Sequence, residues 1–531
     1  MEETRRLVRS AGVMSFMTLV SRVLGYVRDN LQAQILGASR SADAFIIAFR
    51  IPNLLRRLVG EGAFTAAFVP TLSEYLRPER RAELWRFAAL VFWTMATVLA
   101  VLSALGVIFS PAIVKVLAYG FSGIEQKFDL TVSLNRLMFP YLLFIGLAAL
   151  VQGILNVHGR FAVPAFTPVL LNLSIIGAAL LLAPRMQEPA YAFAWGVLLG
   201  GALQLGFQIP FVMRLGMRFP PMLGFGHPGV KQIGRLMGPG LFGMGITQIT
   251  LLLDSFFASL MREGSVSALY YSGRINELAL GSFAISVSTV ILPTLSRQAA
   301  EGRVDQMRST LLYGLRVVAF ITIPSAVGLM VLREEIVGVL FEHGRFSPED
   351  TMFVAHALFF YAIGLFPFGA VKILAPAFYS HKDTRTPAIT AAVTLGAHVV
   401  LVTLLSFAMG TGGIALADSL SASINMTLLM SLFAARYGLP WVRGLAWPAL
   451  RYLAASAVMG GAAWLMVGWV GRAVAGFPMA PALALFTTLA ASAGLYFLIC
   501  WLMGSEELRD VMATLPLPGI RRRRPGSPSG R

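Results

Sequence analysis

The sequence has little charge and almost no cysteine. Charged residues make up 13% of its 531 residues, whereas soluble proteins carry about 25%. The single cysteine, Cys500, excludes a disulfide framework within the chain and any cysteine-based metal cluster. The sequence has no GxxxxGK[ST] motif, which excludes a P-loop ATPase. Its six histidines are scattered, so no metal site is assigned. Hydrophobic residues, in contrast, make up 56% of the chain.

Long apolar runs recur along almost the whole chain. Each is long enough to cross a bilayer core of about 30 Å. We therefore predict an all-α, polytopic membrane protein with fourteen transmembrane helices. They lie near residues 10–36, 41–71, 87–112, 136–157, 163–184, 189–213, 236–261, 266–295, 311–332, 351–379, 388–409, 412–435, 446–470 and 480–503.

The net charge of +17 could indicate nucleic-acid binding, but the positions of the cations indicate a membrane topology. When the segments between the predicted helices are assigned alternately to the two sides, 26 Lys and Arg fall on the side with both termini and nine on the other. Cytoplasmic loops carry such an excess. The pattern predicts two cytoplasmic termini and no nucleic-acid partner. The basic tail, with Arg521 to Arg524, is interpreted as a topology anchor that could contact membrane lipids.

Two motifs recur at one offset, which indicates an internal repeat. Residues 70–73 (PTLS) recur at 293–296, and the turn at 159–165 aligns with 382–388. Pro70 and Pro293 are as far apart along the chain as Pro164 and Pro387. The offset spans six predicted helices, an even number, so the copies have the same orientation, as in transporters built from parallel repeats. The predicted parts are an N-terminal lobe (1–218), a C-terminal lobe (219–440), two extra helices (441–507) and a basic tail (508–531).

Charged residues are concentrated in the first two predicted helices. A charge at mid-membrane costs about 2.5–3.5 kcal/mol on insertion scales, so each needs a partner or a water-filled cavity. Guanidinium groups suit a phosphate or pyrophosphate, because they donate paired hydrogen bonds in a fixed plane. The candidates for substrate binding are Arg22, Arg28, Asp29, Asp43, Arg56, Arg57, Glu61 and Arg274.

Two interpretations of these charges are open. Internal ion pairs would hold the first, second and eighth predicted helices together. We favour this for the acids Asp29, Asp43, Glu61 and Glu277. Ligand contact is favoured for Arg28, Arg57 and Arg274, because arginines outnumber nearby acids. Arg22, Arg50 and Arg56 fit either interpretation. Helical facing prefers Arg57 over Arg56, since Arg50, Arg57 and Glu61 share a face.

Asp254 in the seventh predicted helix has no cation at helical spacing inside the membrane. A lone buried carboxylate is protonated, paired across helices, or a ligand for a coupling cation. Thr394 and Asn425 on later helices could supply neutral oxygens to such a cation. A structural or protonation role and a cation site are both open for Asp254.

Several motifs point to one family. They are residues 21–29 (SRVLGYVRD), 42–45 (ADAF), 52–57 (PNLLRR), 61–64 (EGAF), 159–161 (GRF), 237–239 (MGP), Tyr270 and Tyr271 with Arg274, and 372–376 (KILAP). Together they resemble the MurJ/MviN family, the lipid II flippases of the multidrug/oligosaccharidyl-lipid/polysaccharide exporter superfamily. The resemblance covers essentially all fourteen predicted helices, and its most specific part is the segment 1–65.

The resemblance implies a two-lobed transporter with a central cationic cavity and a groove for the polyprenyl tail in the last two helices. The family moves lipid II, the undecaprenyl-pyrophosphate-linked peptidoglycan precursor, from the cytoplasmic to the outer leaflet of the bacterial cytoplasmic membrane. In this interpretation Arg28, Arg56 and Arg274 engage the pyrophosphate, and Asp29 orients them. The resemblance also implies a partnership with cell-wall synthesis machinery. It implies no cofactor.

The chain departs from the family pattern in two places. Some members place an acid directly before the arginine that corresponds to Arg274 in the eighth predicted helix. This chain has Gly273 at that position. Sodium-binding members use an acid in the seventh helix with polar residues on the eleventh and twelfth helices. In its eleventh predicted helix this chain has His398 and Val402, where an amide and a carboxylate would be expected. Coupling to Na⁺, to H⁺ or to the membrane potential is therefore open.

Two other functions are alternatives. An exporter of another polyprenyl-linked oligosaccharide or of drugs would have the same architecture, although a cationic cleft argues against cationic drugs. A membrane enzyme acting on polyprenyl phosphates would need paired acids for a divalent ion near the membrane surface, and the sequence shows no such pair. We therefore expect a transporter and not an enzyme.

Overall fold

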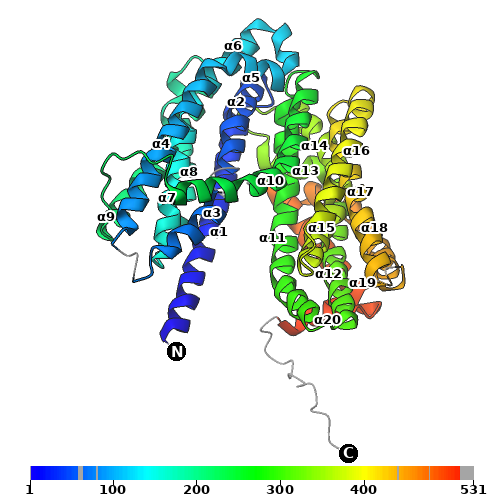
Figure 1. Cartoon of the computed structure of the whole chain (residues 1–531). Coiled ribbons are helices and arrows are strands. Elements are labelled where there is room, and N and C mark those ends of the chain that lie inside the picture. Colours follow the sequence, from blue (N-terminus) through cyan, green and yellow to red (C-terminus); the bar gives the residue numbers. More distant parts are fainter. Residues whose placement is uncertain are drawn as a thin grey trace, which may run out of the picture. The chain divides into compact units, whose positions relative to one another are not determined.

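The structure is a computed structural model that describes residues 2–57, 64–78, 82–438, 440, 442–477 and 479–514. These residues form helices joined by short turns, and none of them lies in a strand (Figure 1). The first helices are α1 (Glu2–Leu36), α2 (Arg40–Arg56), α3 (Phe64–Glu74), α4 (Leu84–Ile108), α5 (Ser110–Leu117), η2 (Tyr119–Gly123), α6 (Glu125–Met138), α7 (Tyr141–Val157), α8 (Ala162–Leu181), η3 (Ala183–Arg185) and α9 (Ala190–Arg214).

The remaining helices follow in the same order along the chain. They are α10 (Pro228–Ser259), α11 (Ser265–Ala300), α12 (Val304–Val331), α13 (Arg333–Phe341), α14 (Pro348–Ile363), α15 (Leu365–Tyr379), α16 (Arg385–Met409), α17 (Thr411–Tyr437), η4 (Val442–Ala446), α18 (Trp447–Ala473), α19 (Ala480–Leu502) and α20 (Glu506–Thr514).

Helix boundaries recur with the offset of the sequence motifs. The starts of α5, α6 and α8 precede the starts of α13, α14 and α16 by the same distance along the chain that separates Pro70 from Pro293. The turn before α8 contains Gly159 with φ +71°, and the turn before α16 contains Lys382 with φ +59° at the corresponding position. A left-handed residue ends a helix by letting the chain turn away from its axis. The two halves therefore share helix starts and turn geometry.

Nine helical segments of the described chain are long and apolar enough to cross a membrane, or ten if the bent pair α14 and α15 is one span. The two helices of that pair meet at 43°. The predicted spans that do not meet this criterion lie in α1, α2, α10 and α11. Three of them, α1, α2 and α11, contain charged residues of the predicted substrate site.

The chain divides into two compact units. Unit 1 comprises residues 1–271, 340–354 and 398–414, and unit 2 comprises residues 272–339, 355–397 and 415–531. Unit 1 therefore includes ends of α13, α14, α16 and α17, helices whose remainder belongs to unit 2. The lobe boundaries expected near residues 218 and 440 stay a prediction.

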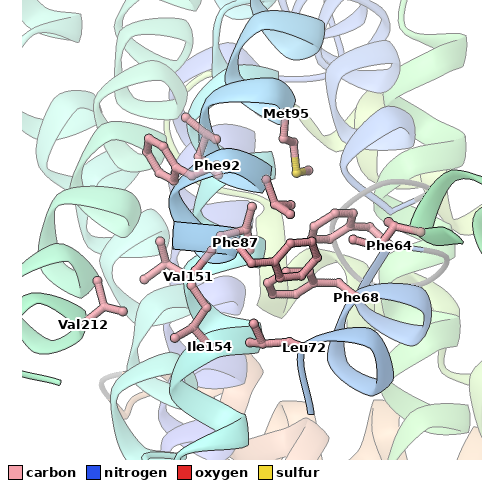
Figure 2. Packing of buried hydrophobic residues seen from close by; sticks show 14 of the residues in the cluster. Phe64, Phe68, Leu72, Phe87, Phe92, Met95, Val151, Ile154 and Val212 are labelled. Carbon is pink, nitrogen blue, oxygen red and sulfur yellow. The ribbon is translucent and has the colours of Figure 1, made fainter. Parts of the chain in front are cut away.

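In unit 1, the apolar core gathers side chains from α3, α4, α7 and α9. Phe64, Phe68 and Leu72 of α3 lie beside Phe87 of α4 and Ile154 of α7 (Figure 2). Between membrane helices, close fit replaces the hydrophobic effect as the source of stability, because lipid tails are as apolar as the side chains. The core also includes Ile233 of α10, so it holds α3 against α7 and α10.

In unit 2, α12 packs against α15 and α18, and α18 packs against α19. Their shared core includes Phe320 of α12, Tyr452 and Met459 of α18, and Tyr496 and Cys500 of α19. The hydroxyl of Tyr496 donates to the carbonyl oxygen of Phe320 at 2.8 Å. The two last long helices are thus attached to the second half of the repeat through α12.

Candidate functional site

Arg28 and Asp29 form the centre of a polar cluster in unit 1. Nε and Nη2 of Arg28 donate to Oδ1 of Asp29 at 3.0 and 2.7 Å. Nη1 of Arg28 donates to Oδ1 of Asn172 on α8 at 3.1 Å, and the hydroxyl of Tyr270 on α11 donates to Oδ1 of Asp29 at 3.0 Å. The two charged side chains are only 15% and 5% exposed. Asp29 and Asn172 therefore fix the orientation of the Arg28 guanidinium.

Asn172 and Tyr270 belong to this cluster, although the sequence does not predict them as site residues on their own. Nδ2 of Asn172 also donates to the carbonyl oxygen of Ser21 at 3.0 Å, which ties α8 to α1. Asn172 is far from Arg28 along the chain, so no local spacing could reveal the contact. A polar residue inside an apolar run was the available signal.

The other predicted arginines of α1 and α2 are more accessible. Arg22 and Arg57 are exposed, and Arg56 is half-buried, with its Nε donating to Oδ1 of Asn53 at 3.0 Å. Arg50, on the predicted face of Arg57, donates through Nη1 to the carbonyl oxygen of Leu251 on α10 at 2.9 Å. Arg50 therefore joins two helices.

Glu61, the last predicted site residue of this region, lies outside the described residues. Internal pairing and substrate contact both stay open for Glu61.

The side chain of Asp43 on α2 is buried, and both of its carboxylate oxygens accept hydrogen bonds. Its carboxylate is 1% exposed and accepts from Nζ of Lys127 at 2.7 Å and from the backbone N–H of Gly264 at 2.9 Å through Oδ2. Oδ1 accepts from the backbone N–H and the hydroxyl of Ser267, both at 2.8 Å. A carboxylate has about four acceptor positions, so all of them are used. This geometry favours internal pairing of Asp43 over direct substrate contact.

The turn between α10 and α11 lies close to the turn between α1 and α2. Gly264 has φ +85°, and a Cβ added there would lie 2.4 Å from the carbonyl oxygen of Ala38. Only glycine fits this position, because a side chain would be both strained and in collision. The approach brings the backbone N–H groups of Gly264 and Ser267, at the start of α11, to the carboxylate of Asp43.

Lys127 is a buried cation that pairs with Asp43, although the sequence predicts it in a loop between membrane helices. The residue lies in α6 and is 2% exposed, with Nζ also 4.1 Å from the ring centroid of Phe121. The assignment of cations to the two sides of the membrane places it in an outer loop. A buried ion pair with Asp43 compensates the cost of removing both charges from water.

Asp254 on α10 pairs with a histidine. Oδ1 of Asp254 lies 3.0 Å from Nε2 of His398 on α16, and both residues are buried, at 6% and 1% exposure. Pairing across helices is one of the options that the sequence leaves open for this acid. His398 is therefore the partner that helical spacing within α10 could not identify.

In unit 2, Arg274 and Glu277 form an ion pair on α11 with Nη1 and Oε2 2.9 Å apart. Their side chains are 36% and 63% exposed. Thr394 and Asn425, the predicted neutral cation ligands, each bury a side-chain oxygen that has no hydrogen-bond partner among the described residues. Such oxygens are available to a ligand.

The arrangement is related to known transporters at the level of the fold. A solved inward-facing conformation of a multidrug resistance MATE family transporter of the MOP superfamily has a TM-score of 0.63 and 14% identity, covering 82% of this chain and 95% of that chain. At this identity the similarity concerns the fold alone. It defines the class as a helical, multi-span membrane transporter fold.

The family follows from closer similarities. The family model "Lipid II flippase MurJ" matches residues 32–499. A "Probable lipid II flippase MurJ" of Vibrio cholerae is 41% identical, covering 86% of this chain and 89% of the relative. A "Lipid II flippase MurJ" of Burkholderia cenocepacia is 35% identical, covering 94% and 98%. This chain belongs to the lipid II flippase MurJ family, and the resemblance seen in the sequence is confirmed.

A solved structure supports the same assignment. The "Lipid II flippase MurJ, inward closed conformation" has a TM-score of 0.78 and 27% identity, and the similarity covers 94% of this chain and 99% of that one. The structural similarity to a member of the family thus extends over nearly the whole chain.

Proposed function

We propose that this chain translocates lipid II from the cytoplasmic to the outer leaflet of a bacterial cytoplasmic membrane by alternating access. The observation that carries this proposal is the family match across residues 32–499, together with the named flippases that share 35% and 41% identity with the chain. A multi-span transporter fold fits a flippase better than an enzyme. Lipid II and the surrounding membrane lipids are the partners, and contact with cell-wall synthesis machinery is proposed from the family alone.

The proposed topology has fourteen spans and cytoplasmic termini. The ten apolar spans of the described chain, with α14 and α15 as one, leave α1, α2, α10 and α11 as four further helices of sufficient length. The helix boundaries that recur at the offset of the repeat support two six-helix lobes of the same orientation. In this proposal α18 and α19 are the extra pair and form the groove for the polyprenyl tail.

The substrate's pyrophosphate is proposed to bind the arginines of α1, α2 and α11. Arg28 is the strongest candidate, because Asp29 and Asn172 hold its guanidinium in place inside unit 1. A guanidinium held by its neighbours loses little entropy when it binds a phosphate. The other arginines proposed to bind the pyrophosphate are the exposed Arg22 and Arg57 and the half-buried Arg56 and Arg274.

Coupling is proposed at Asp254. Its carboxylate lies beside the imidazole of His398, and both groups can carry a proton. H⁺ is therefore the proposed coupling ion, with Thr394 and Asn425 as the oxygens that would serve Na⁺ instead. Flipping measured in vesicles under a pH gradient, a Na⁺ gradient or a potential alone separates the three sources. Dependence on the Na⁺ gradient alone would exclude the proton.

The first test replaces Arg28 by alanine in cells in which this protein is the only flippase and can be depleted. The measurement is the fraction of lipid-linked peptidoglycan precursor that an outside-only reagent reaches. We expect depletion to abolish accessibility, wild type to restore it, and Arg28→Ala to restore less than about a tenth, because a lost charge-assisted contact amounts to about tenfold or more.

The matched control is Arg472→Ala. Arg472 lies in the last turn of α18 and is exposed, and its Nε donates to the carbonyl oxygen of Gly468 in the same helix at 3.2 Å. This variant should restore accessibility fully. Normal flipping by well-expressed Arg28→Ala protein would remove Arg28 from the substrate site. Accessibility that does not change on depletion would instead favour an exporter of another polyprenyl-linked oligosaccharide or of drugs.

A further inference from the structure

Unit 2 contains a small cavity far along the chain from the proposed substrate arginines of α1 and α2. Its volume is about 170 Å³, and its walls are α12, the start of α18, the end of α19 and the start of α20. Drug-sized ligands occupy pockets of about 300–1,000 Å³, so this one suits a smaller group. The charged and reactive side chains that line it are Arg316, Arg451, Tyr452, Cys500, Glu506 and Glu507.

One carboxylate of the cavity is structural. Glu507 is 3% exposed, and its Oε2 accepts hydrogen bonds from the hydroxyls of Tyr452 and Ser505, the latter at 3.0 Å. Its Oε1 lies 3.3 Å from Nε of Arg316. Arg316 therefore neutralises Glu507 and ties α20 to α12.

Two opposite charges of the cavity remain near the surface. Arg451 is exposed and lies over the indole of Trp447, with 5.3 Å between Cζ and the ring centroid. Glu506 has a side chain that is 71% exposed, and its Oε2 lies at the longer distance of 3.4 Å from Nη1 of Arg316. The cavity thus offers a guanidinium and a carboxylate to a ligand at the same time.

The cavity lies where a membrane interface is expected. Trp447 begins α18 and is 56% exposed, and Trp501 near the end of α19 is 62% exposed. Tryptophan gathers at the level of lipid headgroups, where its ring is amphipathic like its surroundings. Both tryptophans lie at the ends of the two helices that also enclose the cavity.

We propose that this cavity binds the headgroup of phosphatidylethanolamine, with the phosphate on Arg451 and the ammonium on Glu506. A guanidinium donates paired hydrogen bonds to phosphate, and an ionised carboxylate accepts from an N–H donor. Phosphatidylglycerol has no ammonium and leaves the carboxylate facing an anionic lipid. Phosphatidylcholine has a cationic nitrogen without N–H groups and cannot donate to Glu506.

The test measures lipid selectivity of the full-length protein. Delipidated protein in detergent is mixed with equal amounts of the three lipids, and retained lipid is counted by native mass spectrometry. We expect wild type to retain phosphatidylethanolamine over each of the others. Arg451→Ala should lower its retention about tenfold, and Glu506→Gln should remove the preference over phosphatidylcholine, because each loses a hydrogen bond to a charged group. Arg472→Ala, at the other end of α18, is the matched control and should keep the preference.

Equal retention of phosphatidylglycerol, or unchanged selectivity in both variants, would overturn the proposal. Full displacement of phosphatidylethanolamine by an equal concentration of soluble glycerophosphoethanolamine would assign the cavity to a soluble ligand and would overturn the lipid assignment. None of these readouts requires flipping, so failure here and failure of the flippase proposal are distinguishable.

Discussion

The two copies of the repeat share helix boundaries but differ in charge. At the offset of the repeat, Arg28 in α1 corresponds to Leu251 in α10, and Asp43 in α2 corresponds to Val266 in α11. The same helices are thus built with buried charges in the first copy and with apolar residues in the second. Helix length and turn geometry depend on apolar runs and on left-handed turn residues, so the fold tolerates this asymmetry.

The second copy has charges of its own at other positions. Asp254 corresponds to Leu31, and Arg274 corresponds to Ile51. A buried ionisable residue needs a partner, and Asp254 has one in His398. The comparison teaches that the two copies share a scaffold, while their charged residues differ. Replacing a charge by its counterpart from the other copy tests this view directly.

The largest effect on stability is expected for Asp43→Val, which gives α2 the residue of the second copy. Lys127 would be left buried without its carboxylate, at a cost of about 3–5 kcal/mol in the free energy of unfolding. Thermal unfolding of the detergent-solubilised protein measures the loss. Wild-type stability in this variant would contradict the observed pairing.

The double variant Asp43→Val/Lys127→Met is the control for this prediction. It should recover part of the loss, since an apolar pair of similar volume can replace a buried ion pair at little cost. Recovery should stay incomplete, because the backbone N–H groups of Gly264 and Ser267 also lose their acceptor.

A smaller effect is expected at the pair formed by Asp254 and His398. The counterparts in the first copy are Leu31 and Ile175, so the variants are Asp254→Leu, His398→Ile and both together. Polar contacts between membrane helices contribute about 0.6–2 kcal/mol, which is the coupling expected from a double-mutant cycle of unfolding free energies. A coupling of zero would mean that the two residues stabilise their helices independently.

The smallest effect is expected in the turn before α16. Asp383 accepts from the hydroxyl and the N–H of Thr386, and these bonds, followed by the guanidinium of Arg436, lower its pKa from 3.8 to about 2. Its counterpart in the first copy is Arg160, which has no carboxylate to cap a helix. Asp383→Ala should cost about 0.5–2 kcal/mol in the free energy of unfolding, the usual range for a lost side-chain cap at a helix N-terminus.

The pH dependence of this cap has a defined sign. A lowered pKa means that the folded state favours the ionised carboxylate, so the contribution of Asp383 is fully present above pH 3.8 and is lost as the pH falls through about 2. The difference in unfolding temperature between wild type and Asp383→Ala, measured from about pH 6 down to about pH 2, should therefore shrink towards the acid end. A difference that grows in acid would show that the carboxylate is stabilising in its protonated form.

Helix positions were predictable where apolar runs are bounded by turn residues. The segments predicted at 163–184, 189–213 and 388–409 agree with α8, α9 and α16 to within a few positions. The predicted segment 87–112 instead contains most of α4 and the start of α5, separated at Phe109. Hydrophobicity continues through this break, so the apolar pattern could not reveal it.

The positions of buried charges were predictable, but their partners were not. Charge inside an apolar run marks Arg28, Asp29, Asp43 and Asp254, and all four lie in polar clusters. Their partners include residues of distant segments, such as Lys127 for Asp43, because hydrogen bonds between helices depend on packing rather than on spacing along the chain.

By itself, the sequence determined that this is a helical membrane protein with an internal repeat and the motifs of the lipid II flippase family, because apolar run length, turn residues and charge placement are local properties. Only the tertiary structure decided which charged side chains pair with one another inside the protein. Asp43 and Lys127 satisfy each other within unit 1, while Arg22 and Arg57 stay exposed. The reason is physical: a buried charge is stable only with a partner at hydrogen-bond distance, and that distance is set by how helices far apart in the chain come together.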